Sequence, residues 1–331
     1  MSKLAYFDQA FLKSLGDSFM QEVKDFRWKK GISVNELVES LGNVGFQSSE
    51  MKKAVEVIVK MKKDDAKIFF TYTSNMVTSG LRGFFAQLIE LGMVDIIVTT
   101  VGGIEEDIMK AKGEKFIIGK FRADDIELYE KGVNRVGNLF IRNESYLKFE
   151  DTIGKMLLDL YNEKPRWTPS ELIYKLGKNL NDKNSILYQA SKHSVPIFCP
   201  GITDGSFGFH LYMLQQKHPD FVVDVVGDFK NILFSTSQDD KKGIISLGGS
   251  ISKHHAILAS LLNGGLDYAV YLTTAHSSSG SMSGATTEEA KSWGKVKDDS
   301  DVATVIGDVT FTFPLIMVKV LETLEKDGML R

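Results

Sequence analysis

The sequence predicts an α/β protein with a doubly wound, mostly parallel sheet of the Rossmann type, and three observations predict it. Short apolar runs alternate with helical segments over most of the 331 residues. Several runs are apolar at consecutive positions, which is typical of strands that are covered on both faces. Polar or glycine-rich turns follow these runs, where ligands bind in open parallel sheets.

The individual elements follow from periodicity. Apolar runs of strand length predict strands at Lys67–Tyr72, Val94–Thr99, Phe116–Ile118, Val195–Cys199, Phe221–Val226, Gly243–Leu247, Tyr268–Leu272 and Val302–Ile306. Helical spacing of apolar residues predicts helices at Leu81–Leu91, Phe149–Tyr161, Pro169–Leu176, Lys253–Leu262 and Pro314–Glu325. Because the two kinds of segment alternate, we expect helices on both faces of one sheet.

The beginning of the chain has a different character. Residues 1–65 combine helical periodicity with many Lys and Glu residues, and Gly31 and Gly42 interrupt the pattern. We therefore expect an N-terminal helical extension over residues 1–65. Residues 66–331 would then form the α/β domain.

Composition excludes several classes of protein. Apolar residues make up 43% of the chain, charged residues 25%, and the formal net charge is −3. These values indicate a globular protein with neither a nucleic acid nor a membrane as partner. No apolar stretch approaches the roughly 20 residues that span a bilayer, and Met1–Asp8 has no signal-peptide core, so we expect a cytoplasmic protein.

The sequence predicts no metal site and no disulfide. No Cys/His cluster has metal-ligand spacing. The adjacent His254 and His255 would point apart on a helix. The single cysteine, Cys199, lies in an apolar run and is expected to be a buried thiol.

One lysine is the best candidate for chemistry. Lys295 ends the segment Ser292-Trp293-Gly294-Lys295, downstream of His254. A lysine beside an indole loses water, and desolvation favours the neutral amine, which can attack a carbonyl or imine carbon. A nearby His can act as the general base, although a lone Trp-Gly-Lys more often marks a surface lysine.

The turns after the predicted strands suit a dinucleotide. They include Thr73-Ser74-Asn75, Thr99–Gly103, Thr203-Asp204-Gly205, Gly248-Gly249-Ser250, Thr274-Ala275 and Asp308. Glycines allow close backbone approach, amides and hydroxyls hold phosphate, and carboxylates hold ribose hydroxyls. The chain contains no Gly-x-Gly-x-x-Gly, so these residues alone leave a dinucleotide site and ordinary loops as alternatives.

Taken in order, these segments resemble the deoxyhypusine synthase family. The resemblance runs from about Gly45-Phe46-Gln47 to about Pro314-Leu315. It rests on the turns above, on Asn134–Leu139, on Lys253-His254-His255 and on Gly280–Ala285 with Glu289 and Trp293-Gly294-Lys295. Members of this family bind NAD without the usual glycine fingerprint.

The resemblance implies the roles of individual residues. The NAD-contacting residues would be Ser74, Asn75, Thr78, Thr100, Val101, Gly102, Glu106, Asp204, Gly249, Thr274, Ala275, Asp308 and Val309. The polyamine pocket would comprise Glu105, Glu106, His254, Gly280, Ser281, Met282, Glu289, Trp293 and Lys295. Carboxylates at the amines and an aromatic face along the methylenes are what a polyamine requires. Each acid also has a simpler explanation. Glu289 could be a solvated acid on a helix, and Glu105 and Glu106 could form the acidic first turn of a helix, which its dipole favours.

Three positions depart from the family pattern. In the family's best-known eukaryotic members an Asp follows the Gly-Ser-Leu-Gly segment, and Phe209 stands there in this chain. Two further Asp residues of a later loop are replaced by Ser279 and Met282. The amine end of the pocket is therefore less acidic, and the identity of the amine donor and acceptor stays open.

The activity that the resemblance implies is transfer of the aminobutyl group of spermidine, or of a related polyamine. The acceptor would be a lysine of the hypusine-carrying translation initiation factor, and NAD would take and return a hydride. Lys295 would be the nucleophile and His254 the proton acceptor. Family members are homotetramers, so we expect a homotetramer.

Two other functions remain open. A homospermidine-synthase-like enzyme would use a small diamine as acceptor. This alternative stays open because acids are absent at Phe209, Ser279 and Met282. A catalytically silent homologue that regulates an active partner is the third, although the intact Lys295 and His254 count against it.

Overall fold

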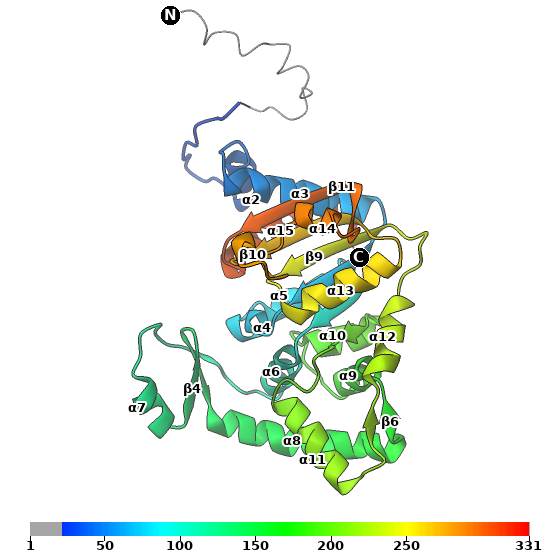
Figure 1. Ribbon diagram of the computed structural model, residues 1–331. Helices are drawn as coiled ribbons and strands as arrows, with labels where there is room; N and C mark the ends of the chain where they lie inside the picture. The colour runs from blue at the N-terminus through cyan, green and yellow to red at the C-terminus, as the bar shows by residue number, and fades with distance from the viewer. Residues whose placement is uncertain (1–21, 331) are drawn as a thin grey trace, which may run out of the picture.

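A six-stranded parallel sheet forms the centre of the molecule, seen in a computed structural model that describes residues 22–330 (Figure 1). Its strand order is β11 (Val296–Ile306), β10 (Leu266–Thr273), β9 (Lys242–Leu247), β1 (Lys67–Tyr72), β2 (Ile96–Thr99) and β7 (Ile197–Phe198). The chain runs outward from β1 through β2 to β7, then crosses to the other side of β1. The predicted doubly wound parallel sheet is thus confirmed, with its switch point between β1 and β9.

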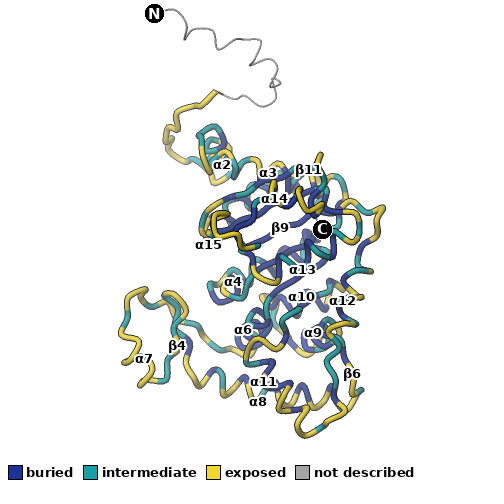
Figure 2. Tube along the Cα trace, in the orientation of Figure 1, coloured by how far each residue is buried: buried dark blue, intermediate teal, exposed yellow. Residues whose placement is uncertain are grey.

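Side chains alternate between two cores on opposite faces of the sheet. Ile68 and Phe70 of β1 belong to a cluster that includes Ile58 of α3 (Gln47–Lys63) and Phe313 of α15 (Val309–Lys326). Phe69 points the other way and joins a cluster with Ile257 of α13 (Ser250–Leu262). Because both faces are covered, β9 is buried along its whole length and β1 is buried after its first residue (Figure 2).

The described part of the predicted N-terminal extension contains two helices. Helix α2 (Val34–Leu41) begins at a capping box, in which Ser33 and Glu36 each accept from the other's backbone amide. Helix α3 packs against β11 and α15, and a Cβ on Gly243 would lie 2.8 Å from the sulfur of Met61. Residues 1–21 lie outside the described range, and a domain boundary after residue 65 remains a prediction.

A buried carboxylate joins three helices beside β2. Asp107 lies on α6 (Val101–Ala111) and accepts hydrogen bonds from Ser185 Oγ at 2.6 Å and the Leu187 amide at 2.9 Å, at the start of α10 (Ile186–His193). It also pairs with Arg82, the first residue of α5 (Arg82–Glu90). The contacts of Asp107 indicate a structural role.

Two predicted strands lie outside the parallel sheet. β3 (Ile117–Ile118) pairs instead with β5 (Leu139–Arg142), which forms a hairpin with β4 (Val133–Val136). β8 (Val222–Val223) pairs with β6 (Arg166–Trp167). Both predicted runs contain a strand, but neither strand pairs with the main sheet, because an apolar run does not specify its pairing partner.

The small antiparallel sheet and α7 (Asp125–Glu130) form an arm on the long helix α8 (Asn143–Glu163) (Figure 1). The arm extends from the body, and its tube is coloured mainly as exposed (Figure 2). Its apolar side chains Ile118, Phe121, Ile126 and Tyr129 are all exposed. These side chains offer a surface that a second protein chain would bury.

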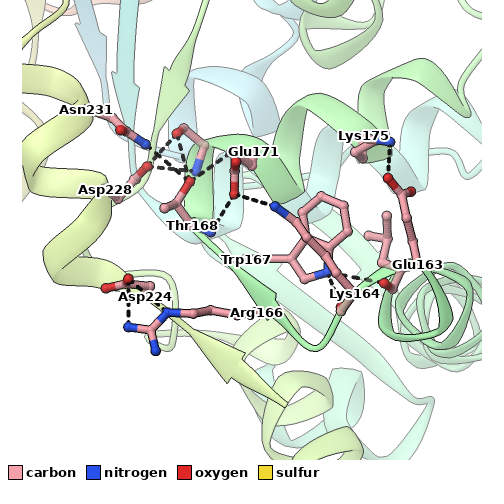
Figure 3. A network of polar contacts seen from close by, with 12 residues as sticks. Glu163, Lys164, Arg166, Trp167, Thr168, Glu171, Lys175, Asp224, Asp228 and Asn231 are labelled. Carbon is pink, nitrogen blue, oxygen red and sulfur yellow. Dashed lines mark hydrogen bonds and ion pairs between the residues drawn. The ribbon is translucent and has the colours of Figure 1, made fainter. Parts of the chain in front are cut away.

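A polar network fixes the corner between α8, α9 (Pro169–Lys178) and α12 (Val225–Leu233) (Figure 3). Thr168 and Glu171 form the capping box of α9, and Asp228 of α12 accepts from the Ser170 amide at 3.1 Å. The Lys164 ammonium lies 4.2 Å from the centre of the Trp167 ring. The network includes an ion pair between Lys164 and Glu171 and lies near the amino end of β7. It is therefore at the opposite edge of the sheet from the carboxyl ends of the strands, where ligands bind in such folds.

The remaining helices are α4 (Asn75–Ser79), α11 (Ser206–Lys217) and α14 (Thr287–Lys291), with one 3₁₀ turn at Ser277–Ser279. No helix within residues 22–330 combines the length and apolar character that crossing a bilayer requires.

Candidate functional site

The turns named in the sequence analysis gather at the carboxyl edge of the parallel sheet. The two turns at the switch point touch, because a Cβ on Gly248 would lie 3.2 Å from Thr73 Oγ1. Gly248 has a φ of +79°, which only glycine adopts without strain. The structure therefore places the turns after β1 and β9 side by side, where doubly wound sheets bind ligands.

The turns after β1 and β2 are joined directly. The Ser74 amide donates to Thr100 Oγ1 at 3.0 Å. A Cβ on Gly102 would lie 2.9 Å from Ser74 Cβ, so glycine is required where the first turn of α6 meets this loop. The Thr100 side chain does not cap α6, and the Gly103 amide donates to the Thr100 carbonyl oxygen at 2.9 Å. The start of α6 therefore has no side-chain acceptor from Thr100, and helix N-termini of this kind can bind an anion.

Glu106 provides an unpaired acceptor close to these turns. Its side chain is 8% exposed, and Oε2 has no hydrogen-bond partner among residues 22–330. Burial raises the pKa of this carboxyl to about 7, against the opposing effects of the Thr78 hydroxyl and the Lys110 charge. A buried carboxylate oxygen without a donor fits a ligand hydroxyl group, such as that of a ribose.

Glu105, the neighbouring residue, is engaged differently. Its Oε1 accepts from the Phe207 amide at 2.7 Å and thereby caps the start of α11. Burial raises its pKa, although the amide hydrogen bonds act in the opposite direction. A Cβ on Gly205 would lie 2.4 Å from this oxygen, so α6 and α11 meet closely here. Glu105 therefore holds α11 in place, and one of its oxygens is already occupied.

The other predicted cofactor carboxylates lie exposed at strand ends. Asp308 caps α15, and its Oδ1 accepts from the Thr310 amide at 2.7 Å. Asp204 lies between β7 and α11. The predicted residues Asn75, Thr274, Ala275 and Val309 follow the ends of β1, β10 and β11. The predicted cofactor residues thus come from loops along one sheet edge.

A second cluster surrounds Lys295, which lies between α14 and β11. The side chain is 6% exposed, although its neighbour Trp293 is 65% exposed. The ammonium lies 4.8 Å from the centre of the Trp293 ring and 3.9 Å from the sulfur of Met282. Lys295 is therefore enclosed by soft, polarisable groups, as its Trp-Gly context led us to expect.

The Lys295 pocket takes its walls from four segments of the chain. Its lining residues are Lys253, Ile257, Tyr271, Met282, Ala285, Thr286, Glu289, Ala290, Trp293 and Lys295. Of the predicted substrate residues, Met282, Glu289, Trp293 and Lys295 meet here, and Glu289 is the only carboxylate in the lining. Glu105, Glu106, His254, Gly280 and Ser281 are not among the residues that line it.

His254 lies next to this pocket on α13 and is partly buried. Burial lowers its pKa, and the positive charge of Lys295 lowers it further. His255 packs against Phe229, with 5.5 Å between ring centres, and burial lowers its pKa to about 4. His254 is therefore the imidazole whose protonation responds directly to Lys295.

One loop connects the two halves of the site. A Cβ on Gly249 would lie 2.4 Å from Ser283 Cα, and the Ser250 amide donates to Ser283 Oγ at 3.0 Å. Ser283 belongs to the same loop as Met282. The start of α13, where the predicted cofactor turn ends, is thus fastened to the loop that reaches Lys295.

The three positions that depart from the family pattern separate in space. Met282 reaches the Lys295 pocket, whereas Phe209 is exposed on the first turn of α11. Ser279 lies in the exposed 3₁₀ turn, and its hydroxyl hydrogen-bonds within that turn. Of these three residues, only Met282 contacts the candidate nucleophile Lys295 within this single chain.

Sequence reasoning missed Lys253 and Tyr271 as parts of the site. Tyr271 was placed only as a buried strand residue, and Lys253 only as the neighbour of His254. The periodicity of α13 contained the signal, because Lys253, Ile257 and Ser260 share one face of the helix. Within residues 22–330, no cluster of three or more His, Cys, Asp or Glu side chains is arranged to hold a metal ion.

Comparison with known proteins identifies related chains. A family model described as deoxyhypusine synthase matches residues 36–320. A probable deoxyhypusine synthase of Schizosaccharomyces pombe is 41% identical over 304 residues, which cover 87% of each chain. The deoxyhypusine synthase of Senecio vernalis is 38% identical over 328 residues, covering 90% of this chain and 88% of that one.

A solved structure agrees with these matches. A crystal structure from Entamoeba histolytica, described as that of a deoxyhypusine synthase, superimposes with a TM-score of 0.67 and 31% identity. It covers 91% of this chain and 97% of the Entamoeba chain. The resemblance therefore extends over the α/β sheet and both clusters of candidate residues.

Proposed function

The chain belongs to the deoxyhypusine synthase family, and from this premise we propose that it transfers an aminobutyl group from spermidine through an imine on Lys295. The acceptor in this proposal is a lysine of the hypusine-carrying translation initiation factor. The observation that carries the proposal is the position of Lys295, which is buried in a pocket between Trp293 and Met282.

The chemistry at Lys295 follows from its surroundings. An amine attacks an imine carbon through its nitrogen lone pair, and Lys295 presents its nitrogen inside the pocket. Attack forms a bond from Nζ to the carbon, and loss of the departing amine leaves an imine on Lys295. Glu289, in the wall of the same pocket, holds a cationic amine of the substrate, and the Trp293 ring lies along its methylene groups.

NAD is the cofactor in this proposal, and the residues present fit it. Glu106 offers a buried oxygen without a donor, Gly102 allows close backbone approach, and the start of α6 has no side-chain cap. Asp308 and Asp204 supply exposed carboxylates at the same edge. When bound, NAD supplies a hydride acceptor. His254, with its lowered pKa, accepts the proton that the amine releases during oxidation.

A homotetramer is part of the proposal. Four exposed apolar side chains, Ile118, Phe121, Ile126 and Tyr129, lie on the arm around α7. Contact with another copy would remove this surface from water, which is favourable by about 25 cal/mol per Å² of apolar area. Sedimentation equilibrium should give four chains per particle, and a monomer at micromolar concentration would contradict this part.

One observation favours a second function. Met282 approaches Lys295, and Glu289 is the only carboxylate in the pocket lining. One acid in the pocket can hold one amine of a small diamine while its other amine accepts the group, so homospermidine-synthase-like transfer to a small diamine is the alternative. A catalytically silent homologue is disfavoured, because Lys295 is intact and enclosed.

One experiment separates the three functions. The purified protein is incubated with NAD and spermidine labelled in the aminobutyl group, and either putrescine or the translation factor is added. Label on the factor supports the proposal, and label in homospermidine supports the alternative. If neither acceptor becomes labelled and the enzyme carries no label, both transfer functions are contradicted and the catalytically silent homologue is left.

A further inference from the structure

We propose that Lys253 is a second catalytic amine in the Lys295 pocket, which takes the proton that Lys295 loses during attack and delivers it to the departing amine. The inference rests on the proposed transfer through Lys295. It adds a residue to that reaction and assigns it a proton-transfer step.

The first observation is how completely Lys253 is buried and how few partners it has. Its side chain is 1% exposed. Within residues 22–330, Nζ reaches a single hydrogen-bond acceptor, the carbonyl oxygen of Ala285, at 2.9 Å. It also lies 3.8 Å from the centre of the Tyr271 ring. A protonated amine has three donors to satisfy, and this environment offers one carbonyl and one ring face.

These contacts match a neutral amine better than an ammonium. A neutral amine has two N–H groups, for which the Ala285 carbonyl and the Tyr271 ring suffice. Its lone pair is then left to accept a proton inside the pocket. Burial lowers the pKa of Lys253 to about 8, the Lys295 charge lowers it as well, and the Glu289 charge acts in the opposite direction.

The second observation is that Lys253 and Lys295 line one small pocket. The other titratable groups that line it are Tyr271 and Glu289. The pKa of Tyr271 is raised by burial, and the tyrosine is therefore neutral near pH 8. Glu289 is exposed and holds a cation in the proposed reaction. Lys253 and Lys295 therefore face the same pocket, and in the proposed step the group attached to Lys295 Nζ meets Lys253 there.

The proton balance of the step is closed. As the Lys295 amine attacks the imine carbon, a C–N bond forms and the Lys295 nitrogen becomes positively charged. Lys253 accepts a proton from that nitrogen. It then gives the proton to the amine that departs, while the C–N bond to that amine breaks and the imine forms on Lys295. No oxidant, reductant or further proton source is needed.

The test compares the pH dependence of adduct formation in matched variants. The full-length protein is mixed with NAD and spermidine in a single turnover, the imine is trapped with borohydride, and the Lys295 peptide is quantified from pH 6 to 10. Lys253→Met keeps the length and burial of the side chain but cannot titrate. Lys253→Arg keeps a cation that stays protonated. Lys242→Met is the control, because Lys242 is equally buried but bonds Ser237 and Asp240 carbonyls at the other end of β9.

We expect both Lys253 variants to form the adduct on the order of 100-fold more slowly, a typical effect of losing a general base. They should also lose the rise in rate that is centred near pH 8, whereas Lys242→Met should keep it. A Lys253→Met protein that is slower but keeps this rise would show a structural role only and overturn the proposal. Absence of the Lys295 adduct in the wild-type protein would contradict the proposed function itself, and the role of Lys253 would fall with it.

Discussion

The sulfur of Met282 lies 3.9 Å from the ammonium nitrogen of Lys295. The position beside the candidate nucleophile is therefore occupied by a polarisable apolar group. Met282 is one of the three positions at which the sequence departs from the family pattern, so the contact connects that departure to the candidate reacting atom.

Replacing Met282 by an acid should change amine preference. We expect Met282→Asp to raise the rate with spermidine relative to putrescine and agmatine, because a second carboxylate beside Glu289 holds another cationic centre. Phe209→Asp, on exposed α11, is the comparison. Initial rates with each amine at fixed NAD provide the measurement, and an unchanged order of preference in both variants would contradict this account.

Glu289 should matter more than the acid beside it. Both side chains are exposed, but Glu289 lines the Lys295 pocket, whereas Glu288 pairs with Lys291 at 3.2 Å. Loss of a charged hydrogen-bond partner typically costs about 1.5–3 kcal/mol, so Glu289→Gln should lower turnover roughly 10- to 100-fold. Glu288→Gln should remain close to wild type. If Glu289→Gln is near wild type with every amine, the polyamine binds elsewhere.

The exposed carboxylates at the sheet edge should bind the cofactor. We expect Asp308→Ala and Asp204→Ala each to weaken NAD binding by roughly 10- to 100-fold, because each removes a charged acceptor for ribose hydroxyls. Asp159→Ala, on the exposed face of α8, is the control. Isothermal calorimetry gives the affinity, and wild-type binding by both site variants would refute the placement of the cofactor.

Glu106 should make stability depend on pH in a defined window. Its pKa in the folded protein is about 7, whereas the ordinary pKa of a glutamate is 4.5. The folded protein therefore holds a proton that the unfolded chain releases, and the free energy of unfolding should fall as pH rises from 4.5 through 7. Glu106→Gln removes this loss, so it should stabilise the ligand-free protein by on the order of 2–3 kcal/mol at pH 8 and little at pH 4.5.

Chemical unfolding at the two pH values measures this difference. Glu56→Gln is the matched control, because Glu56 is exposed on α3. Equal effects of Glu106→Gln at both pH values would show that Glu106 is not held with a raised pKa.

The main sheet could be predicted well because its strands are apolar on both faces. β1 was predicted with the bounds Lys67–Tyr72 that the structure has. β11 was predicted only from Val302, since its first half carries Lys297, Asp298 and Asp299 and has no strand pattern. Val225 and Val226 were assigned to a strand but begin α12, because Asp224 accepts from the Gly227 amide and caps a helix there.

The candidate site could be predicted in part, because single residue types carry only local information. The Trp-Gly context of Lys295 indicated an enclosed amine, and the side chain is buried. The hydrogen bond from the Phe207 amide to Glu105 and the burial of Lys253 arise from helix packing between distant segments. No local pattern encodes such contacts, so these two residues could be understood only from the structure.

Trapping of the enzyme imine is the measurement that tests the central claim most directly. The protein is incubated with NAD and spermidine, reduced with borohydride and digested, and the modified peptide is identified by mass spectrometry. We expect one aminobutyl adduct on Lys295, and none in Lys295→Arg, because arginine stays protonated and forms no imine. Lys295→Arg should still fold and bind NAD. An adduct on Lys253 or Lys297 in place of Lys295, or an adduct that persists in Lys295→Arg, would contradict the account.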